Sequence, residues 1–397
     1  MGKQEADVVK LRFNNSIFLL MVTQMGKNHV PKNHDGREAF DIYKDNEDEG
    51  NQISKTYKGF TKRKLVFLIA GLLLLFIGVI IAAQNGPIDI PFLDVVKYIV
   101  TFDSNGAGAV IWNIRMVRII GALLAGAGLA VTGVVMQCVL HNPLASPFTL
   151  GISSASAFGA SFAIIFLGAG SSVTATVLIN NPYVTTICAF LFSLVATGSI
   201  LVLTKITKVS AETMVLAGVA ISAMFAAGLS FMQYIATDSQ LGNIVAWTFG
   251  DLGKATWTWN SLILLVTLPV VLYFFYRRWD YNALDAGEDT AKGLGVNTSR
   301  ERILGMLLSS VLSAVIVSFF GIIAFIGLLG PHIARMIIGS DHRYLIPLSI
   351  ILGGIILLAA DGVGQVILYP SVIPVGIITS MLGGPLFIYL LIRRYRK

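Results

Sequence analysis

The first long apolar stretch of the chain is Leu65–Ala83, which reads LVFLIAGLLLLFIGVIIAA. Its 19 consecutive apolar or small residues form a helix long enough, at about 1.5 Å per residue, to cross a hydrocarbon core of roughly 30 Å. Backbone groups in lipid must be hydrogen-bonded within the protein, so such a run folds as an α-helix. A transmembrane β-barrel would instead show alternating segments of about ten residues. The stretch therefore predicts an all-α integral membrane protein.

The composition of the whole chain agrees with this prediction. Of its 397 residues, 55% are hydrophobic and 13% are charged, whereas about a quarter of the residues in soluble domains are charged. The lysines and arginines behind the net charge of +7 are scattered between apolar runs, which argues against nucleic acid as a partner. Hydropathy predicts ten spans, near residues 65–83, 117–138, 148–168, 183–204, 213–236, 259–276, 303–320, 322–338, 345–360 and 374–392.

The distribution of basic residues predicts the orientation of the chain. With ten spans, most lysines and arginines of the short loops fall on one side, which the positive-inside rule assigns to the cytoplasm. We therefore expect both termini to be cytoplasmic in a multi-pass protein of the plasma membrane. Residues 1–64 are polar, with acidic and basic clusters, and we expect a loose cytosolic tail there, followed by a ten-helix membrane domain at 65–397.

Residues suited to chemistry are few. Cys138 and Cys188 lie in apolar segments without metal-ligand spacing, and the histidines near span ends do not form a metal motif either. The string GDLGKAT at 250–256 lacks the first glycine of a phosphate loop. We therefore expect no catalytic residue, no metal site, no cofactor and no nucleotide site, so that energy comes from an ion gradient or from another subunit.

Ionisable groups at membrane depth separate these two sources of energy. A gradient-driven transporter should carry a buried titratable relay, for which Asp361 is the main candidate. Capping a helix end or bonding to a neighbouring span is at least as good an interpretation of this residue. The scarcity of charge favours a passive conduit for a large organic ligand.

Several stretches, in order along the chain, resemble the FecCD family of ABC-importer permeases. The resemblance is carried by IRMVRIIGALLAGAGLAVTGVVMQCVLHNPLASPFTLGISSASAFGA (Ile114–Ala160), MVLAGVAISAMF (Met214–Phe225), WTFGDLGKATW (Trp247–Trp257), ALDAGEDTAKGLGVN (Ala283–Asn297), IGLLGPHIARMIIGSDHR (Ile326–Arg343) and IPVGIITSMLGGPLFIYLL (Ile373–Leu391). It covers roughly residues 65–397. The resemblance implies a homodimer of ten-helix subunits, seated on a cytoplasmic ABC ATPase dimer and fed by an external substrate-binding protein.

The expected function is therefore that of a permease subunit for an iron–siderophore or a related chelate. A cobalamin or haem permease is the alternative within the family, and an oxyanion is a further family substrate. A gradient-driven secondary transporter and a membrane anchor or sensor are the alternatives from other classes. The resemblance leaves the identity of the ligand open.

The resemblance also implies three sets of site residues. Arg115 and Arg118, three residues apart at the start of the second span, resemble docking arginines for the binding protein. The loop 284–296 is expected to form a short helix and turn that dock into the ATPase. The coupling residues are Leu284, Asp285, Gly287, Glu288, Ala291 and Gly295, and the inner gate is expected at Val209, Ser210, Ala211, Glu212 and Thr213.

Overall fold

The structure is a computed structural model that describes residues 36–86, 88, 90–102, 105–169, 182–207 and 211–395. Regular structure in these residues is entirely helical. The chain divides into two compact units, Met1–Arg63 and Lys64–Lys397. In chain order the helices are α2 (Gly36–Gln84), α3 (Phe92–Thr101), α4 (Ala107–Val110), the π turn η1 (Ile111–Met116), α5 (Val117–Val139), η2 (Pro147–Leu150), α6 (Ile152–Phe166), α7 (Pro182–Thr207), α8 (Ala211–Ile235), α9 (Asp238–Thr248), η3 (Leu252–Lys254), α10 (Trp257–Tyr276), α11 (Arg278–Asp285), α12 (Glu288–Gly293), α13 (Thr298–Phe320), α14 (Ile326–Ile338), α15 (His342–Val366) and α16 (Val375–Tyr395).

Each of the ten predicted spans falls on a helix of the structure. Seven helical segments are long and apolar enough to cross a membrane, and they fall on α2, α5, α7, α8, α10, α13 and α15. The other three predicted spans correspond to α6, α14 and α16. The all-α membrane fold is therefore confirmed, whereas the shortness of α6 and α14, at 15 and 13 residues, was not predicted.

Helix α5 is the centre of the larger group of helices. It packs against α10, α13, α14 and α15, and most of its residues are buried. Its glycines allow backbones to approach closely: a Cβ atom added at Gly133 would lie 1.7 Å from the carbonyl oxygen of Gly327 on α14. Gly126 makes the same kind of contact with Gly353 on α15, at 2.3 Å. Small residues at these positions thus let α5 pack closely against α14 and α15.

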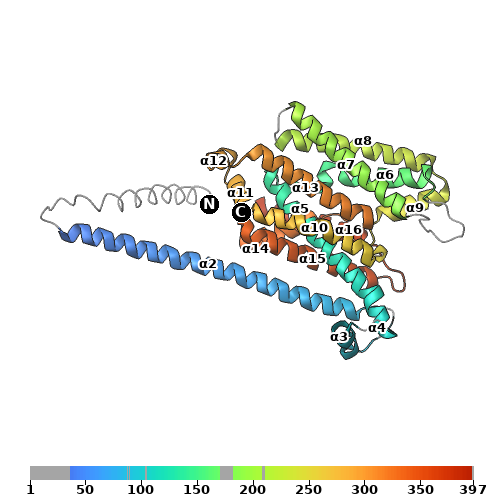
Figure 1. Cartoon of the computed structure of the whole chain (residues 1–397), viewed down its shortest axis with the longest axis horizontal. Coiled ribbons are helices and arrows are strands. Elements are labelled where there is room, and N and C mark those ends of the chain that lie inside the picture. Colours follow the sequence, from blue (N-terminus) through green and yellow to red (C-terminus); the bar gives the residue numbers. More distant parts are fainter. Residues whose placement is uncertain are drawn as a thin grey trace. The chain divides into compact units, whose positions relative to one another are not determined.

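A second group of helices forms around α6, which packs against α7, α8 and α9. Helix α13 joins the two groups, because it contacts α5 on one side and α6 and α7 on the other (Figure 1). A cluster of Phe158, Phe162, Phe192 and Phe225 fills the contact between α6, α7 and α8.

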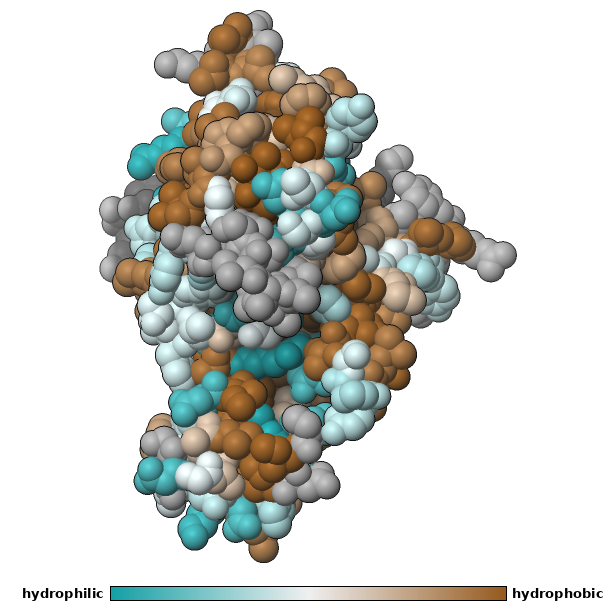
Figure 2. Space-filling model, turned by 90° about the vertical axis from the view of Figure 1, so that its right-hand side faces the viewer, coloured by the Kyte–Doolittle hydropathy of each residue, from teal (hydrophilic) through white to brown (hydrophobic). Residues whose placement is uncertain are grey.

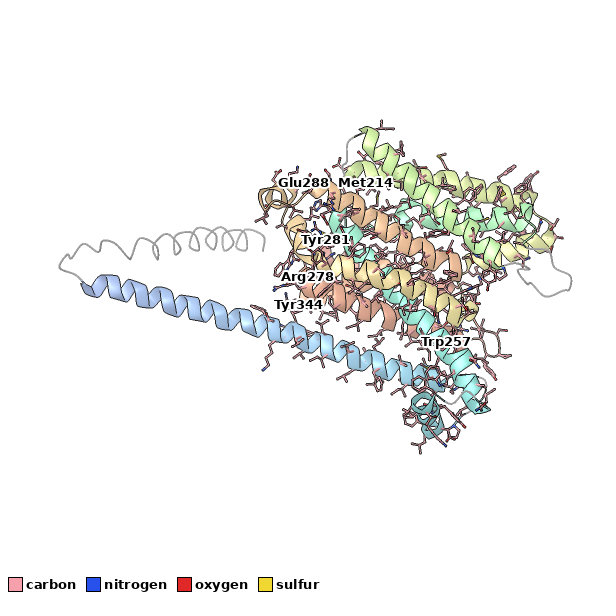
Figure 3. The ribbon with its side chains drawn as sticks, in the orientation of Figure 1. Met214, Trp257, Arg278, Tyr281, Glu288 and Tyr344 are labelled. Atoms are coloured by element: carbon pink, nitrogen blue, oxygen red, sulfur yellow. The ribbon has the colours of Figure 1, made fainter. Side chains whose placement is uncertain are left out.

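The functional regions lie at opposite ends of this bundle (Figure 1). We call the region of α11, α12 and the adjoining ends of α5, α13 and α15 the α12 end. The region of α9, η3 and the start of α10 is the α9 end. Helix α10 runs from one to the other, and its 20 residues give a separation of about 30 Å. Figure 3 shows Glu288 and Tyr281 at the α12 end and Trp257 at the α9 end.

Candidate functional site

A cavity of about 350 Å³ lies at the α9 end. Hydrophilic residues show between hydrophobic ones on this face of the molecule (Figure 2). The lining combines aromatic, hydroxyl and charged side chains: Pro182, Thr185, Thr186, Asn243, Ala246, Trp247, Phe249, Asp251, Lys254, Trp259, Ser318, Phe319 and Pro374. Such a mixture of apolar walls with a few polar groups is typical of sites that bind organic ligands.

Two glycines hold the loop between α9 and η3 against the end of α13. Gly250 has a φ of +67°, and a Cβ atom added there would lie 2.1 Å from the carbonyl oxygen of Ile322. Gly321 has a φ of +80°, and its added Cβ atom would lie 2.4 Å from the carbonyl oxygen of Trp247. The backbone N–H of Asp251 donates to the carbonyl oxygen of Phe320 at 2.8 Å. This loop leads directly into η3, whose last residue is Lys254, so these contacts fix where its side chain starts.

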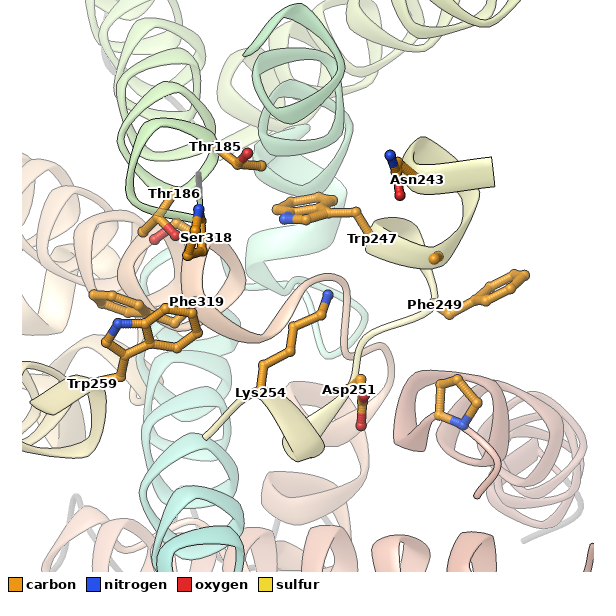
Figure 4. A pocket seen from close by; sticks show the side chains of 13 residues that line it. Thr185, Thr186, Asn243, Trp247, Phe249, Asp251, Lys254, Trp259, Ser318 and Phe319 are labelled. Carbon is orange, nitrogen blue, oxygen red and sulfur yellow. The ribbon is translucent and has the colours of Figure 1, made fainter. Parts of the chain in front are cut away.

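Lys254 is the distinctive residue of the cavity, and Figure 4 shows its side chain reaching between Trp247 and Ser318. Its Nζ atom is buried, and within the described part of the chain no acceptor forms a hydrogen bond with it. Burial lowers the pKa of its ammonium group, and the charge of Asp251 offsets only part of this effect. The Asp251 carboxylate instead accepts the N–H of Gly253 at 2.7 Å. The cavity therefore offers a cation with unused hydrogen-bonding capacity to an anionic group.

The two predicted docking arginines are both engaged within the protein. Arg115 is 6% exposed, and its guanidinium donates to the carbonyl oxygens of Ala83, Gln84 and Ile88. Its docking role stays a prediction that its side-chain geometry does not support. The sequence argument placed Arg115 and Arg118 on one side of an α-helix, but Arg115 belongs to the π turn η1. The wider hydrogen-bonding pattern of such a turn changes the direction of its side chains.

Arg118 forms a bidentate ion pair with Asp361 on α15. Its Nε and Nη2 atoms donate to the carboxylate at 2.8–3.0 Å, and Gln365 donates to the same carboxylate at 2.7 Å. The Asp361 side chain is 4% exposed and that of Arg118 is 17% exposed. Asp361 thus bonds to a neighbouring span, one of the two structural interpretations that the sequence allowed for it.

The predicted coupling loop contains a short helix, α12, as expected. Its residues divide into two kinds. Leu284 and Ala291 are 1% and 0% exposed and pack inside the protein, whereas Asp285 and Gly295 are exposed. Gly287, with a φ of +118°, makes the turn between α11 and α12. Other exposed residues of this loop, among them Thr290 and Leu294, were not among the predicted coupling residues.

Glu288, the first residue of α12, holds this helix to α13. Its carboxylate pairs with Arg302 at 3.1 Å and with Lys292 at 3.0 Å. Hydrogen bonds from these two residues lower the pKa of Glu288 to about 2. The Arg302 side chain is 3% exposed and also donates to the carbonyl oxygen of Val139 at 3.0 Å. The Glu288 side chain is 40% exposed and so belongs to the surface, and its ion pair with Arg302 also links α12 to α13. We call an ion pair that links two elements in this way a brace.

A second brace involves Glu301, the residue of α13 that directly precedes Arg302. The Glu301 side chain is 1% exposed and accepts hydrogen bonds from Arg277, which sits between α10 and α11. The hydrogen bond with Glu301 raises the pKa of Arg277, and Asp280 also pairs with this arginine at 3.0 Å. The two braces connect the α11–α12 element to α13, one through Glu288 of α12 and one through Arg277 at the junction of α10 and α11.

The predicted inner gate is only partly visible. Val209 and Ser210 lie outside the described residues. Ala211, Glu212 and Thr213 form the first turn of α8, where Glu212 is exposed and the following Met214 is fully buried. The gate therefore stays a prediction.

The sequence argument also missed the cavity around Lys254. In the sequence, Lys254 was weighed only as part of a string that resembles a phosphate loop. The available signal was a single lysine among the tryptophans 247, 257 and 259 in a chain of low charge.

Comparison with known proteins gives consistent matches. The model of the FecCD transport family matches residues 73–393. A protein of Methanocaldococcus jannaschii named as an ABC transporter permease protein is 50% identical over 346 residues, covering 87% of this chain and 99% of the relative. The hemin transport system permease protein of Yersinia pestis is 34% identical, covering 83% of this chain and 95% of that protein. A solved metal-chelate type ABC transporter in an inward-facing conformation has a TM-score of 0.70 and 30% identity, covering 83% of this chain and 99% of that chain.

Proposed function

The chain belongs to the FecCD transport family and is the permease of a metal-chelate type ABC importer in the plasma membrane, and from this premise we propose how it is powered and what it carries. A separate cytoplasmic ATPase dimer docks on the α12 end. An iron–siderophore or a related chelate enters from an external binding protein at the α9 end. Two copies of the chain form the translocation pathway between them, with both termini in the cytoplasm.

The observation that carries this proposal is the exposed and braced α11–α12 element. A coupling element must present a surface to its partner and must also transmit force to the spans without deforming. Asp285, Asp289 and Leu294 present such a surface, and Leu294 is 56% exposed although it is apolar. The ion pairs of Glu288 and Glu301 supply the rigid connection to α13 and α10.

The acidic groups within the spans argue against a gradient-driven mechanism. A proton or ion relay needs titratable groups that are free to change partners at membrane depth. Asp361 is held by Arg118 and Gln365, and Glu301 is held by Arg277. Both acidic groups thus have structural partners, which favours an external source of energy.

The cavity at the α9 end favours an anionic cargo. A buried ammonium group gains most from a ligand that brings carboxylate or phenolate oxygens, because each such contact replaces water lost on burial. Siderophores and haem carry such groups around or beside their metal. The aromatic side chains Trp247 and Trp259 add an apolar surface for the organic part of the chelate.

The docking of the binding protein is proposed at the same end. Arg118 is the better candidate for a contact with acidic side chains, since its side chain is 17% exposed while Arg115 is buried. Exchanging both arginines for glutamate would also remove the internal partners of Asp361 and of three carbonyl groups. A loss of docking in that variant therefore supports the docking role only if the variant folds as the wild type does.

Reconstitution in liposomes tests the proposal. The chain with its ATPase and binding protein should take up a ferric siderophore only when ATP is hydrolysed. Leu294→Arg should reduce ATP-driven uptake at least tenfold while leaving thermal unfolding of the chain unchanged, because its side chain is exposed. Glu288→Arg should reduce uptake and also destabilise the chain, since Arg302 loses its partner.

Two results would contradict the proposal. One is uptake by the purified chain alone down a proton gradient. The other is full ATP-driven uptake by the Leu294→Arg variant, which would exclude the α12 end as the coupling surface.

A further inference from the structure

Three side chains from distant parts of the sequence meet at the α12 end. Cys138 is the last residue but one of α5, Asp285 ends α11 and His342 begins α15. One potential ligand atom from each residue lies within 4.8 Å of the others. Cys138 and His342 are 1% and 0% exposed, while the Asp285 side chain is 28% exposed. The cluster is thus buried on two sides and reaches solvent through its carboxylate.

The hydrogen bonds of the cluster leave its ligand atoms available. The Cys138 thiol donates weakly to the carbonyl oxygen of Tyr281, at 3.4 Å, which leaves the sulfur lone pairs unused. The Nδ1 atom of His342 lies 3.1 Å from the amide oxygen of Asn282 and 3.8 Å from the Asp285 carboxylate. Both neighbours are acceptors, so Nδ1 carries the proton in the neutral ring and Nε2 carries the lone pair.

The second nitrogen of this histidine gives an independent indication. Nε2 of His342 is buried, and within the described residues it has no hydrogen-bond partner. A buried polar atom without a partner costs free energy, and an unused imidazole lone pair is what a metal ion requires. The structure therefore contains a histidine that is held in place by Asn282 and still has coordinating capacity at Nε2.

We propose that Cys138, Asp285 and His342 form a binding site for a thiophilic divalent cation of the Zn²⁺ or Fe²⁺ class. One thiolate, one imidazole and one carboxylate match the preference of these ions, whereas Mg²⁺ and Ca²⁺ select oxygen ligands. A thiolate and a carboxylate together neutralise the charge of the ion. Water can supply the fourth ligand through the exposed side of Asp285, which also provides the route of entry.

The separations in the cluster are compatible with this assignment. In a tetrahedral zinc site the ligand atoms lie about 3.3–3.8 Å from one another, given metal–ligand distances of about 2.0–2.3 Å. The observed upper limit of 4.8 Å therefore requires a contraction of about 1 Å. Rotation of the exposed Asp285 side chain can provide most of it, because this residue is the last of α11 and precedes the turn at Gly287.

Few charged groups surround the cluster. Arg335 of α14 acts on Cys138 from nearby, and its guanidinium donates to Gln137 at 3.0 Å. Asp341, which precedes α15, is paired with Arg343 at 2.7 Å. Because the thiolate and the carboxylate together neutralise a divalent cation, the complex has little net charge for Arg335 to repel.

A bound cation would connect three helices that the chain does not connect directly. It would join the end of α5 to α11 and to the start of α15, and α11 leads into the exposed α12. Binding to the folded state alone should therefore raise the unfolding temperature. The sequence argument expected no metal site, because residues 138, 285 and 342 have no motif spacing.

Cobalt spectroscopy on the purified full-length chain tests the site. The protein is prepared in detergent without a polyhistidine tag, stripped with a chelator under reducing conditions and titrated with Co²⁺. We expect a thiolate-to-cobalt charge-transfer band and visible bands typical of tetrahedral geometry, both removed by added Zn²⁺. Zn²⁺ alone should raise the unfolding temperature of the stripped protein. No ATPase is needed, so the result is independent of the coupling proposal.

The two cysteines supply a matched pair of variants. Cys138→Ser should abolish the charge-transfer band, while Cys188→Ser on α7 should keep it unchanged. Asp285→Asn, a change at an exposed position that preserves the fold, should weaken Co²⁺ binding at least tenfold, as should His342→Gln. An unchanged band in Cys138→Ser, unchanged affinity in Asp285→Asn, or the absence of any band in folded wild-type protein would overturn the proposal.

Discussion

The two ends of the bundle differ in whether their buried charged groups have partners. At the α12 end, Glu301 is paired with Arg277, and Arg302 is paired with Glu288. At the α9 end, the amine of Lys254 is buried without a hydrogen-bond partner among the described residues, although Asp251 is nearby. Paired charges rigidify a structure, whereas an unpaired buried charge costs stability and is retained where a ligand can use it. The comparison assigns force transmission to one end and ligand contact to the other.

The pairing at the α12 end can be broken by Glu301→Ala. We expect this change to lower the free energy of unfolding by about 2 kcal/mol, because Arg277, which keeps Asp280 as a partner, loses its charge-assisted hydrogen bonds to the buried Glu301. The measurement is a denaturant titration of the purified protein in mixed micelles. Glu212→Ala on the exposed first turn of α8 serves as the control and should change stability by less than about 0.5 kcal/mol. A loss below about 1 kcal/mol in Glu301→Ala would show that the brace is not structural.

At the α9 end, removal of a charged side chain should instead raise the free energy of unfolding. Lys254→Met removes a desolvated ammonium group and keeps most of the side-chain volume, so we expect stability to rise by about 1–2 kcal/mol. Uptake of an anionic chelate should fall about tenfold, equivalent to about 1.4 kcal/mol. Lys254→Arg is the matched control and should retain part of the uptake. If Lys254→Met is less stable than the wild type, the amine has an internal partner and the contrast between the ends is lost.

The pH dependence of that variant sharpens the test. Burial lowers the pKa of Lys254 in the folded protein, so the unfolded chain binds more protons between the folded pKa and the ordinary value of 10.5. The penalty for the buried charge is fully present below the folded pKa and is relieved as pH rises through this window. The stability advantage of Lys254→Met should therefore shrink as pH approaches 10.5. An advantage that is constant with pH would exclude the ammonium charge as its cause.

Glu288 should give a smaller effect, in an acidic window of pH. Its pKa in the folded protein is about 2, against an ordinary value of 4.5. The stabilisation is present above pH 4.5 and is lost as pH falls towards 2, where the carboxylate becomes protonated in both states. Because the side chain is 40% exposed, solvent screening limits the effect to about 1 kcal/mol or less. Glu288→Gln should remove this dependence on pH, and a pH profile identical to that of the wild type would contradict the pairing with Arg302.

The sequence predicted the fold well but the site residues less well. The ten helices were found because each depends on a continuous apolar run, which is a local property of the chain. The loop predicted for coupling contains a short helix, and its coupling role stays a prediction. Leu284 and Ala291 pack inside the protein, and the exposed Leu294 was not among the predicted residues. Arg115 was expected at the surface and is buried, since hydropathy does not reveal a π turn.

Hydrophobic length and motif order by themselves determined that this chain is a multi-pass membrane protein of one transport family. Only the tertiary structure decided which polar groups have partners. Arg118 and Asp361 are separated by 243 residues, and Cys138, Asp285 and His342 come from three helices. Such contacts depend on how helices pack through glycines such as Gly126 and Gly133. The physical reason is that insertion into lipid is governed by each segment separately, whereas charge pairing and coordination need atoms from distant segments to meet within a few ångströms.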